Sequence, residues 1–206
     1  MLTKNQLEIF EVFLANPFIE YSYKNLQKLS KEKSNNAFQL AVNRFRKEKL
    51  VRERKIGKSV LYNLDMTNGL NMAYLSLAAN NRLNHLAADT VKDFIEELDK
   101  YTVFYSLVVF GSYSDNTYTK KSDLDIAILI PAKQKESDVK VAINTMTRRS
   151  VLELDCHAIT HGDFLEMLKA DYENLGKQIA RKSLPVYNNA IFYKTVMEGM
   201  KNGFAH

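Results

Sequence analysis

Two aspartates separated by one residue, Asp123 and Asp125, lead into an apolar run from Ile126 to Ile130. A run of this length, rich in β-branched residues, predicts a buried strand. Since side chains alternate between the two faces of a strand, Asp123 and Asp125 point the same way. Neighbouring carboxylates repel each other unless they are solvated or share a divalent cation. The pair therefore predicts a site for a divalent cation.

A glycine-serine pair, Gly111-Ser112, ends an earlier apolar run from Val103 to Phe110, which is also predicted to be a strand. Glycine lets a phosphate group approach the backbone, and the free N–H groups at the start of a following helix attract an anion. An anion-binding turn beside metal-binding carboxylates contains the groups that phosphoryl or nucleotidyl transfer needs.

The whole stretch resembles the signature of the DNA polymerase β-type nucleotidyltransferase superfamily, and in particular its minimal nucleotidyltransferase branch. The resemblance lies in Gly111-Ser112, a ten-residue spacer and Asp123-x-Asp125 between two apolar strands. It covers residues 103–130 and continues more weakly to the C-terminus. It implies an α+β domain over 101–206 with a mixed β-sheet flanked by helices. The implied activity is Mg²⁺-dependent transfer of a nucleoside monophosphate from an NTP to a hydroxyl acceptor.

Members of this superfamily often carry a third carboxylate on a neighbouring strand. The alternating segment from Val151 to Ile159 predicts such a strand, with Glu153 and Asp155 on one face. The resemblance implies that Asp123 and Asp125 hold Mg²⁺ and are catalytic. Asp155 is the predicted third ligand and helps to deprotonate the attacking hydroxyl, with Glu153 as the alternative.

The resemblance also implies a nucleotide-binding set. Gly111 and Ser112 would hold the β- and γ-phosphates through backbone N–H groups and the serine hydroxyl. Ser122 directly precedes the aspartate pair, and Lys121 adds positive charge in the same loop.

The residues after Gly111-Ser112-Tyr113 depart from the pattern of the minimal branch, which has a small residue, an arginine and a glycine. This chain has Ser114, Asp115 and Asn116. An acid in place of the arginine puts negative charge near the expected triphosphate. It keeps open the hypothesis that the domain binds a nucleotide without turnover.

The first 65 residues predict three helices followed by a hairpin. Thr3 caps the first helix, which ends at Asn16-Pro17, and a short second helix carries Leu26 and Leu29. The third helix runs from Ala37 to about Lys49, and strand, basic turn and strand follow over 50–62. This order resembles a winged helix-turn-helix DNA-binding domain, which we place at residues 1–65.

The basic character of the chain is confined to this segment. Residues 1–65 hold 13 Lys and Arg against 7 Asp and Glu, a net charge of +6, whereas the whole chain has +5. This bias predicts a polyanion partner, and the resemblance to a winged helix-turn-helix domain implies that the partner is double-stranded DNA. The predicted DNA-binding residues lie on the third helix and the hairpin: Asn43, Arg44, Arg46, Lys47, Arg52, Arg54, Lys55 and Lys58. The alternative is a solvated basic face on a module used for packing or dimerisation.

Residues 66–100 are predicted to be linker helices that pack on the flanking domains. They form either two helices, the second capped by Asp89 or Thr90, or one continuous helix. Beyond the second apolar run, residues 132–147 predict a loop and then a helix, and helical pieces follow toward the C-terminus.

Composition narrows the class of protein. The longest apolar runs fall far short of the roughly 20 residues that span a bilayer, which predicts no membrane association. The N-terminus does not resemble a secretory signal, and the single cysteine, Cys156, fits a reducing compartment. The sequence therefore predicts a cytoplasmic protein. A homodimer through the N-terminal domain or the 70–100 helices is a further hypothesis.

The sequence is compatible with three functions. The first is a nucleotidyltransferase with a DNA-binding winged helix domain. The second is a non-catalytic, nucleotide-sensing DNA-binding transcriptional regulator. The third is an enzyme that modifies nucleic acid, in which the basic domain brings RNA or DNA to the site.

Overall fold

The computed structural model describes residues 1–132 and 136–206. The chain divides into two compact units, Met1–Ala78 and Ala79–His206, and the helix α5 (Gly69–Arg82) contributes to both. Among the described residues, no helix is long and apolar enough to cross a membrane.

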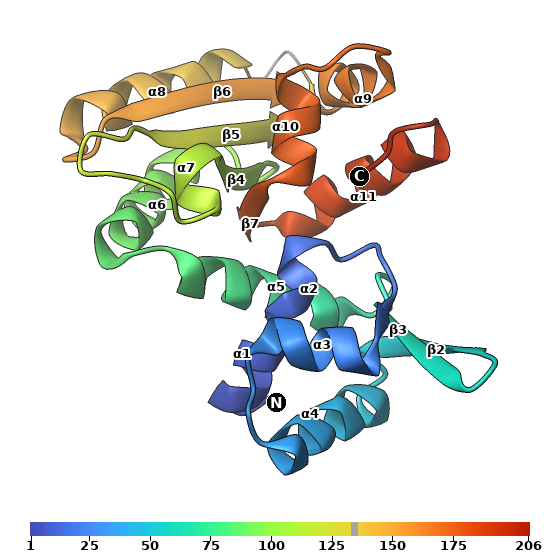
Figure 1. Ribbon diagram of the computed structural model, residues 1–206. Coiled ribbons are helices and arrows are strands. Elements are labelled where there is room, and N and C mark those ends of the chain that lie inside the picture. The colour runs from blue at the N-terminus through green and yellow to red at the C-terminus, as the bar shows by residue number, and fades with distance from the viewer. Residues whose placement is uncertain (133–135) are drawn as a thin grey trace. The chain divides into compact units, whose positions relative to one another are not determined.

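The N-terminal unit is built from helices and a small sheet (Figure 1). Its elements in chain order are α1 (Lys4–Phe10), α2 (Val12–Ala15), β1 (Tyr21–Ser22), α3 (Tyr23–Ser30), α4 (Asn35–Lys47), β2 (Val51–Ile56) and β3 (Ser59–Leu64). The sheet has the order β1-β3-β2, and both pairings are antiparallel. The single helix predicted before Asn16 is thus divided into α1 and α2.

Side-chain caps explain where the helices of this unit begin. Thr3 Oγ1 accepts a hydrogen bond from the Gln6 N–H, and the Gln6 side chain accepts one from the Thr3 N–H, which makes a reciprocal capping box for α1. Ser34 Oγ caps α4 in the same way, by accepting from the Ala37 N–H.

Aromatic residues fill the core of the N-terminal unit. Phe10, Phe13 and Phe45 are completely or almost completely buried, and their rings meet in tilted or edge-to-face pairs. Such pairs add to the stabilisation from apolar burial. Because the apolar positions of α4 are three and four residues apart, the helix buries one face and exposes the opposite one.

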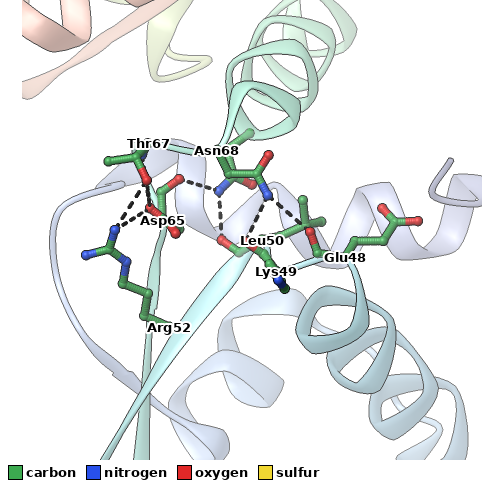
Figure 2. Close-up of polar contacts among 8 residues, drawn as sticks. Glu48, Lys49, Leu50, Arg52, Asp65, Thr67 and Asn68 are labelled. Carbon is green, nitrogen blue, oxygen red and sulfur yellow. Dashed lines mark hydrogen bonds and ion pairs between the residues drawn. The ribbon is translucent and has the colours of Figure 1, made fainter.

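Two asparagines at the start of α5, Asn68 just before it and Asn71 in its first turn, bind the chain that precedes β2 and follows β3. Asn68 Nδ2 donates to the Glu48 and Lys49 carbonyls at 3.1 and 2.9 Å (Figure 2). Asn71 is fully buried, and its Nδ2 donates to the Leu50 and Asp65 carbonyls at 2.7 and 2.9 Å. The Leu50 and Asp65 carbonyls also accept backbone N–H groups, from Asp65 and Asn68, each at 2.9 Å, so the Asn71 amide is a second donor to both.

We expect Asn71→Ala to lower the free energy of unfolding by about 1–3 kcal/mol, because it removes two buried hydrogen bonds of about 0.5–1.5 kcal/mol each. Urea unfolding of the full chain measures the loss. Asn81→Ala is the matched control, since Asn81 is exposed on the same helix and should change stability little. Equal stability of the two variants would contradict the structural role of Asn71.

The C-terminal unit has one four-stranded sheet with the order β6-β5-β4-β7 (Figure 1). The strands are β4 (Ser106–Phe110), β5 (Leu124–Ile130), β6 (Leu154–Thr160) and β7 (Ser183–Tyr187). β5 and β6 are parallel, while β4 pairs antiparallel with both β5 and β7. The mixed sheet with flanking helices confirms the α+β prediction for this unit.

Helices surround this sheet, and α8 supplies the crossover that joins the parallel strands β5 and β6. They are α6 (His85–Leu98), α7 (Gly111–Ser114), α8 (Glu136–Arg149), α9 (His161–Lys169), α10 (Leu175–Arg181) and α11 (Asn189–Lys201). Of the loop and helix predicted over 132–147, residues 133–135 lie outside the described residues.

Three predicted boundaries are wrong. The strand before the glycine turn begins at Ser106, since Val103 and Phe104 are exposed. The strand expected from Val151 begins at Leu154. Asn84, whose Oδ1 accepts from the Ala87 N–H, caps α6 in place of Asp89 or Thr90. Of the two alternatives left open for 66–100, the structure has two helices.

Candidate active site

The turn at Gly111 lies against the carboxylate of Asp125. Gly111 has φ +63°, in the left-handed region, and a Cβ added to it would lie 2.0 Å from Asp125 Oδ2. No side chain fits at that distance. Glycine is therefore required for two reasons: other residues rarely adopt this backbone angle, and the Asp125 carboxylate leaves no room for a Cβ. The fold thus brings together the two halves of the predicted motif.

Strand register explains this contact. Phe110, the last residue of β4, is the partner of Asp125 on the antiparallel strand β5, and Asp155 is the partner of Asp125 on the parallel strand β6. Residues paired in this way direct their side chains to the same face of the sheet. The structure therefore places Asp155 beside Asp125, as the sequence predicts, although its role stays a prediction.

The three aspartates differ in their surroundings. Asp125 is half-buried, whereas Asp123, one residue before β5, and Asp155 are exposed. Burial raises the pKa of Asp125, and the charges of Asp155 and Asp123 raise it further. The His157 Nε2 lies 3.3 Å from Asp155 Oδ1. Negative charge is therefore concentrated around a partly desolvated carboxylate.

This donor set suits Mg²⁺, which proteins hold through one or two carboxylates together with substrate phosphates and water. Among residues 1–132 and 136–206, no three Asp, Glu, His or Cys side chains converge as a ready metal centre. A pair of carboxylates completed by a triphosphate is the arrangement that these residues fit.

A cavity of about 490 Å³ opens beside the turn. Gly111 and Asp125, the predicted residues, line it together with Phe110 and Asp115, which lie close to the turn in sequence. The other lining residues come from α10 and its flanking segments: Glu173, Gln178, Arg181 and Lys182. The last four, Glu173, Gln178, Arg181 and Lys182, are not among the site residues predicted from the sequence. The only signal for them is the adjacent pair of basic residues just before β7, and nothing in their spacing relates them to Gly111.

The two cations of this cavity differ in their pairing. Arg181 makes two hydrogen bonds to the carboxylate of Glu173, at 2.9 and 2.8 Å. Within the described part of the chain, Lys182 forms no ion pair. The Lys182 carbonyl accepts a 3.3 Å hydrogen bond from Ser114 Oγ, which fixes its backbone next to the glycine turn.

The two unusual residues after the turn have different structural explanations. Asn116 has φ +62°, a conformation that asparagine tolerates better than most residues and that suits the glycine expected there. Asp115 accepts hydrogen bonds from Thr117, which lower its pKa, and the nearby Lys182 charge lowers it further. Asp115 is therefore ionised at neutral pH, with Lys182 offsetting part of its charge.

Two predicted nucleotide-binding residues line a different cavity. Lys121 and Ser122 line a separate space of about 490 Å³ with Lys120 and Glu153. Ser122 Oγ accepts a 2.9 Å hydrogen bond from the Thr119 N–H, so its hydroxyl shapes the loop. Ser112, by contrast, is the second residue of α7, beside Gly111.

The predicted DNA-binding residues of the N-terminal unit fall into two groups. The arginines are all paired with acids: Arg44 with Glu48, Arg46 with Glu53, Arg52 with Asp65, and Arg54 with Glu20. Figure 2 shows the Arg52–Asp65 pair. Asn43, Lys47, Lys55 and Lys58 are exposed and make no ion pair or side-chain hydrogen bond within the described residues. The sequence does not reveal this difference, because partners such as Glu20 are remote in the chain.

Comparison with protein families identifies the region that contains this site. Residues 88–183 match the family model described as a nucleotidyltransferase domain. The match supports the nucleotidyltransferase superfamily for this region and, with it, transfer of a nucleoside monophosphate in general. Searches of curated proteins and of solved structures returned no match.

Proposed function

We propose that the protein is a Mg²⁺-dependent nucleotidyltransferase whose N-terminal unit binds double-stranded DNA. The observation that carries the catalytic half is the contact between Gly111 and Asp125 beside an open cavity, within the region that matches the family. The glycine turn receives the triphosphate, and Asp123 and Asp125 are the proposed Mg²⁺ ligands. The bound metal supplies neutralisation of the phosphate charge.

In the proposed reaction the acceptor hydroxyl oxygen forms a bond to the α-phosphorus of the NTP. The bond from that phosphorus to the bridging oxygen of the β-phosphate breaks, and pyrophosphate leaves. Asp155, beside Asp125 in the adjacent strand, is the proposed base for the hydroxyl proton, and Glu153 is the alternative. The exposure of Asp155 supports this role, because an acceptor can approach it from solvent.

The experiment that tests catalysis is incubation of the full chain with each NTP, Mg²⁺ and candidate acceptors, with pyrophosphate release as the readout. Release that depends on Asp125 supports the proposal. Nucleotide binding without release in any combination would instead support the regulator, which senses a nucleotide without turnover. Asp115 in the cavity is the observation that favours this second candidate. Label transferred to added RNA or DNA would identify a nucleic-acid-modifying enzyme.

Lys182 and Asp115 are expected to have opposite effects on NTP affinity. Lys182→Ala removes the unpaired cation of the cavity and should raise the KM for NTP about tenfold, the effect of losing a partly exposed charge contact of about 1.4 kcal/mol. Asp115→Asn removes a repulsive charge and should lower that KM. Steady-state kinetics with varied NTP measure both.

The exposed Lys169→Ala is the matched control for lysine removal. If Lys182→Ala and Lys169→Ala have the same KM, Lys182 does not contact the triphosphate.

The order of elements in the N-terminal unit supports the DNA-binding half. The unit has α1 and α2 in place of a single first helix, then β1, α3, α4 and the β2–β3 hairpin, with β1 beside β3. This order resembles that of a winged helix-turn-helix. In such a module α4 enters the major groove and the hairpin contacts the backbone. The exposed lysines Lys47, Lys55 and Lys58 supply positive charge for phosphates. We further propose a cytoplasmic protein that forms a symmetric dimer on two half-sites.

A further inference from the structure

The exposed face of α4 has an unusual composition for a basic unit. Its positions three and four residues apart, opposite the buried Phe38 and Phe45, carry three amides, one leucine and one lysine: Asn36, Gln39, Asn43, Leu40 and Lys47. Leu40 is 57% exposed although it lies on a helix with a well-filled apolar face. Within the described residues, the side chains of Gln39 and Asn43 make no hydrogen bond.

These side chains match one kind of base pair. Asparagine and glutamine amides form paired hydrogen bonds with adenine in the major groove, and an apolar side chain contacts the thymine methyl group. Guanine is read most often by arginine or lysine. The arginines of this helix are paired with acids, and the exposed Lys47 is the last residue of α4. Arg44 is paired with Glu48 one turn later, and Arg46 is held by Glu53 at 2.6 Å.

The surroundings of this face favour a nucleic acid over a protein. Residues 1–65 have a net charge of +6, and the exposed Lys55 and Lys58 lie on the hairpin β2–β3. A single exposed leucine among amides does not make the apolar centre that a stable protein interface needs.

We propose that α4 reads an A·T-rich duplex site in the major groove through Gln39, Leu40 and Asn43, while Lys47, Lys55 and Lys58 contact phosphates. The inference rests on the DNA-binding half of the proposed function. The further element is the base composition of the DNA site. The uncharged side chains recognise the bases, and the arginines paired with acids do not.

Selection from a random duplex library with the full chain tests the inference. We expect a consensus whose central positions are A·T. Gln39→Ala and Asn43→Ala should each weaken binding to the selected site by about fivefold to a hundredfold and leave binding to a G·C-rich duplex unchanged. Lys55→Ala should weaken binding to both duplexes equally, because a phosphate contact carries no sequence information.

Leu40→Ala should also lose affinity for the selected site. Leu29→Ala is its matched control, since Leu29 is a leucine of similar exposure, 53%, on α3. A G·C-rich consensus, or amide variants that bind the selected site like the wild type, would overturn the inference and leave the DNA-binding proposal intact. Absence of binding to any duplex would overturn both, and pyrophosphate release would still report on the catalytic half.

Discussion

Replacement of Asp125 by asparagine should reduce pyrophosphate release by about a thousandfold or more, the equivalent of the several kcal/mol that a bound metal supplies. Asparagine keeps the size of the side chain and removes the charge that the proposal assigns to Mg²⁺ binding. Since Asp125 also lies against Gly111, a variant of equal size leaves the turn undisturbed. Pyrophosphate release at saturating NTP and Mg²⁺ is the measurement.

The same substitution should make the metal-free protein more stable at neutral pH. The pKa of Asp125 is raised in the folded state by burial and by Asp155 and Asp123. Its ionised form therefore destabilises the fold, and this cost appears as the pH rises through the raised pKa. Asparagine removes the cost. For the same reason, Mg²⁺ should raise the Tm of the wild type and have less effect on the variant.

Asp171→Asn is the control, because Asp171 is exposed in the loop before α10. It should change neither pyrophosphate release nor the response of the Tm to Mg²⁺. An Asp125→Asn variant that keeps full activity would remove Asp125 from the reaction. A variant that loses activity together with its fold would show a structural role, and the Tm of the variant distinguishes the two cases.

The strand and turn pattern around this site is predictable from the sequence because it is local. Apolar runs fix β5, and the glycine that interrupts the first run marks the turn. The pairing of Asp125 with Asp155 follows from the sequence only through the resemblance, which places a third acid on a neighbouring strand. The register that aligns these residues depends on the crossover helix α8, whose packing no local pattern fixes.

The remaining parts of the candidate site depend on contacts between distant segments. Lys182 reaches the cavity because α10 and β7 bring the chain back beside β4, about 70 residues after the glycine turn. Likewise, Arg54 looks like a free DNA ligand in the sequence, but it is bound to Glu20, 34 residues away. Charge patterns indicate that a segment is basic, whereas only the fold shows which cations are free.

Replacement of Gly111 by alanine should impair both folding and catalysis. The left-handed backbone costs an alanine about 1–2 kcal/mol. The added methyl group must also displace the Asp125 carboxylate, whose Oδ2 would lie 2.0 Å from it. Overpacking of this kind costs about 1–3 kcal/mol, so we expect a total loss of about 2–5 kcal/mol in the free energy of unfolding. The fraction that remains folded should turn over about a hundredfold more slowly, because a carboxylate misplaced by about 1 Å no longer positions the reacting groups.

Alanine substitutions at two other glycines separate the effect of backbone strain from that of the collision with Asp125. Gly57 has φ +56° and no atom within 4 Å of an added Cβ, so Gly57→Ala has the backbone strain without the collision. Gly162 in α9 has no left-handed angle and its nearest atom is 3.9 Å away, so alanine there should be neutral or stabilising. We expect stability to fall in the order Gly162→Ala, Gly57→Ala, Gly111→Ala, and pyrophosphate release to fall in the last alone. If Gly111→Ala loses no more activity than Gly57→Ala, the contact between turn and carboxylate is not part of the catalytic geometry.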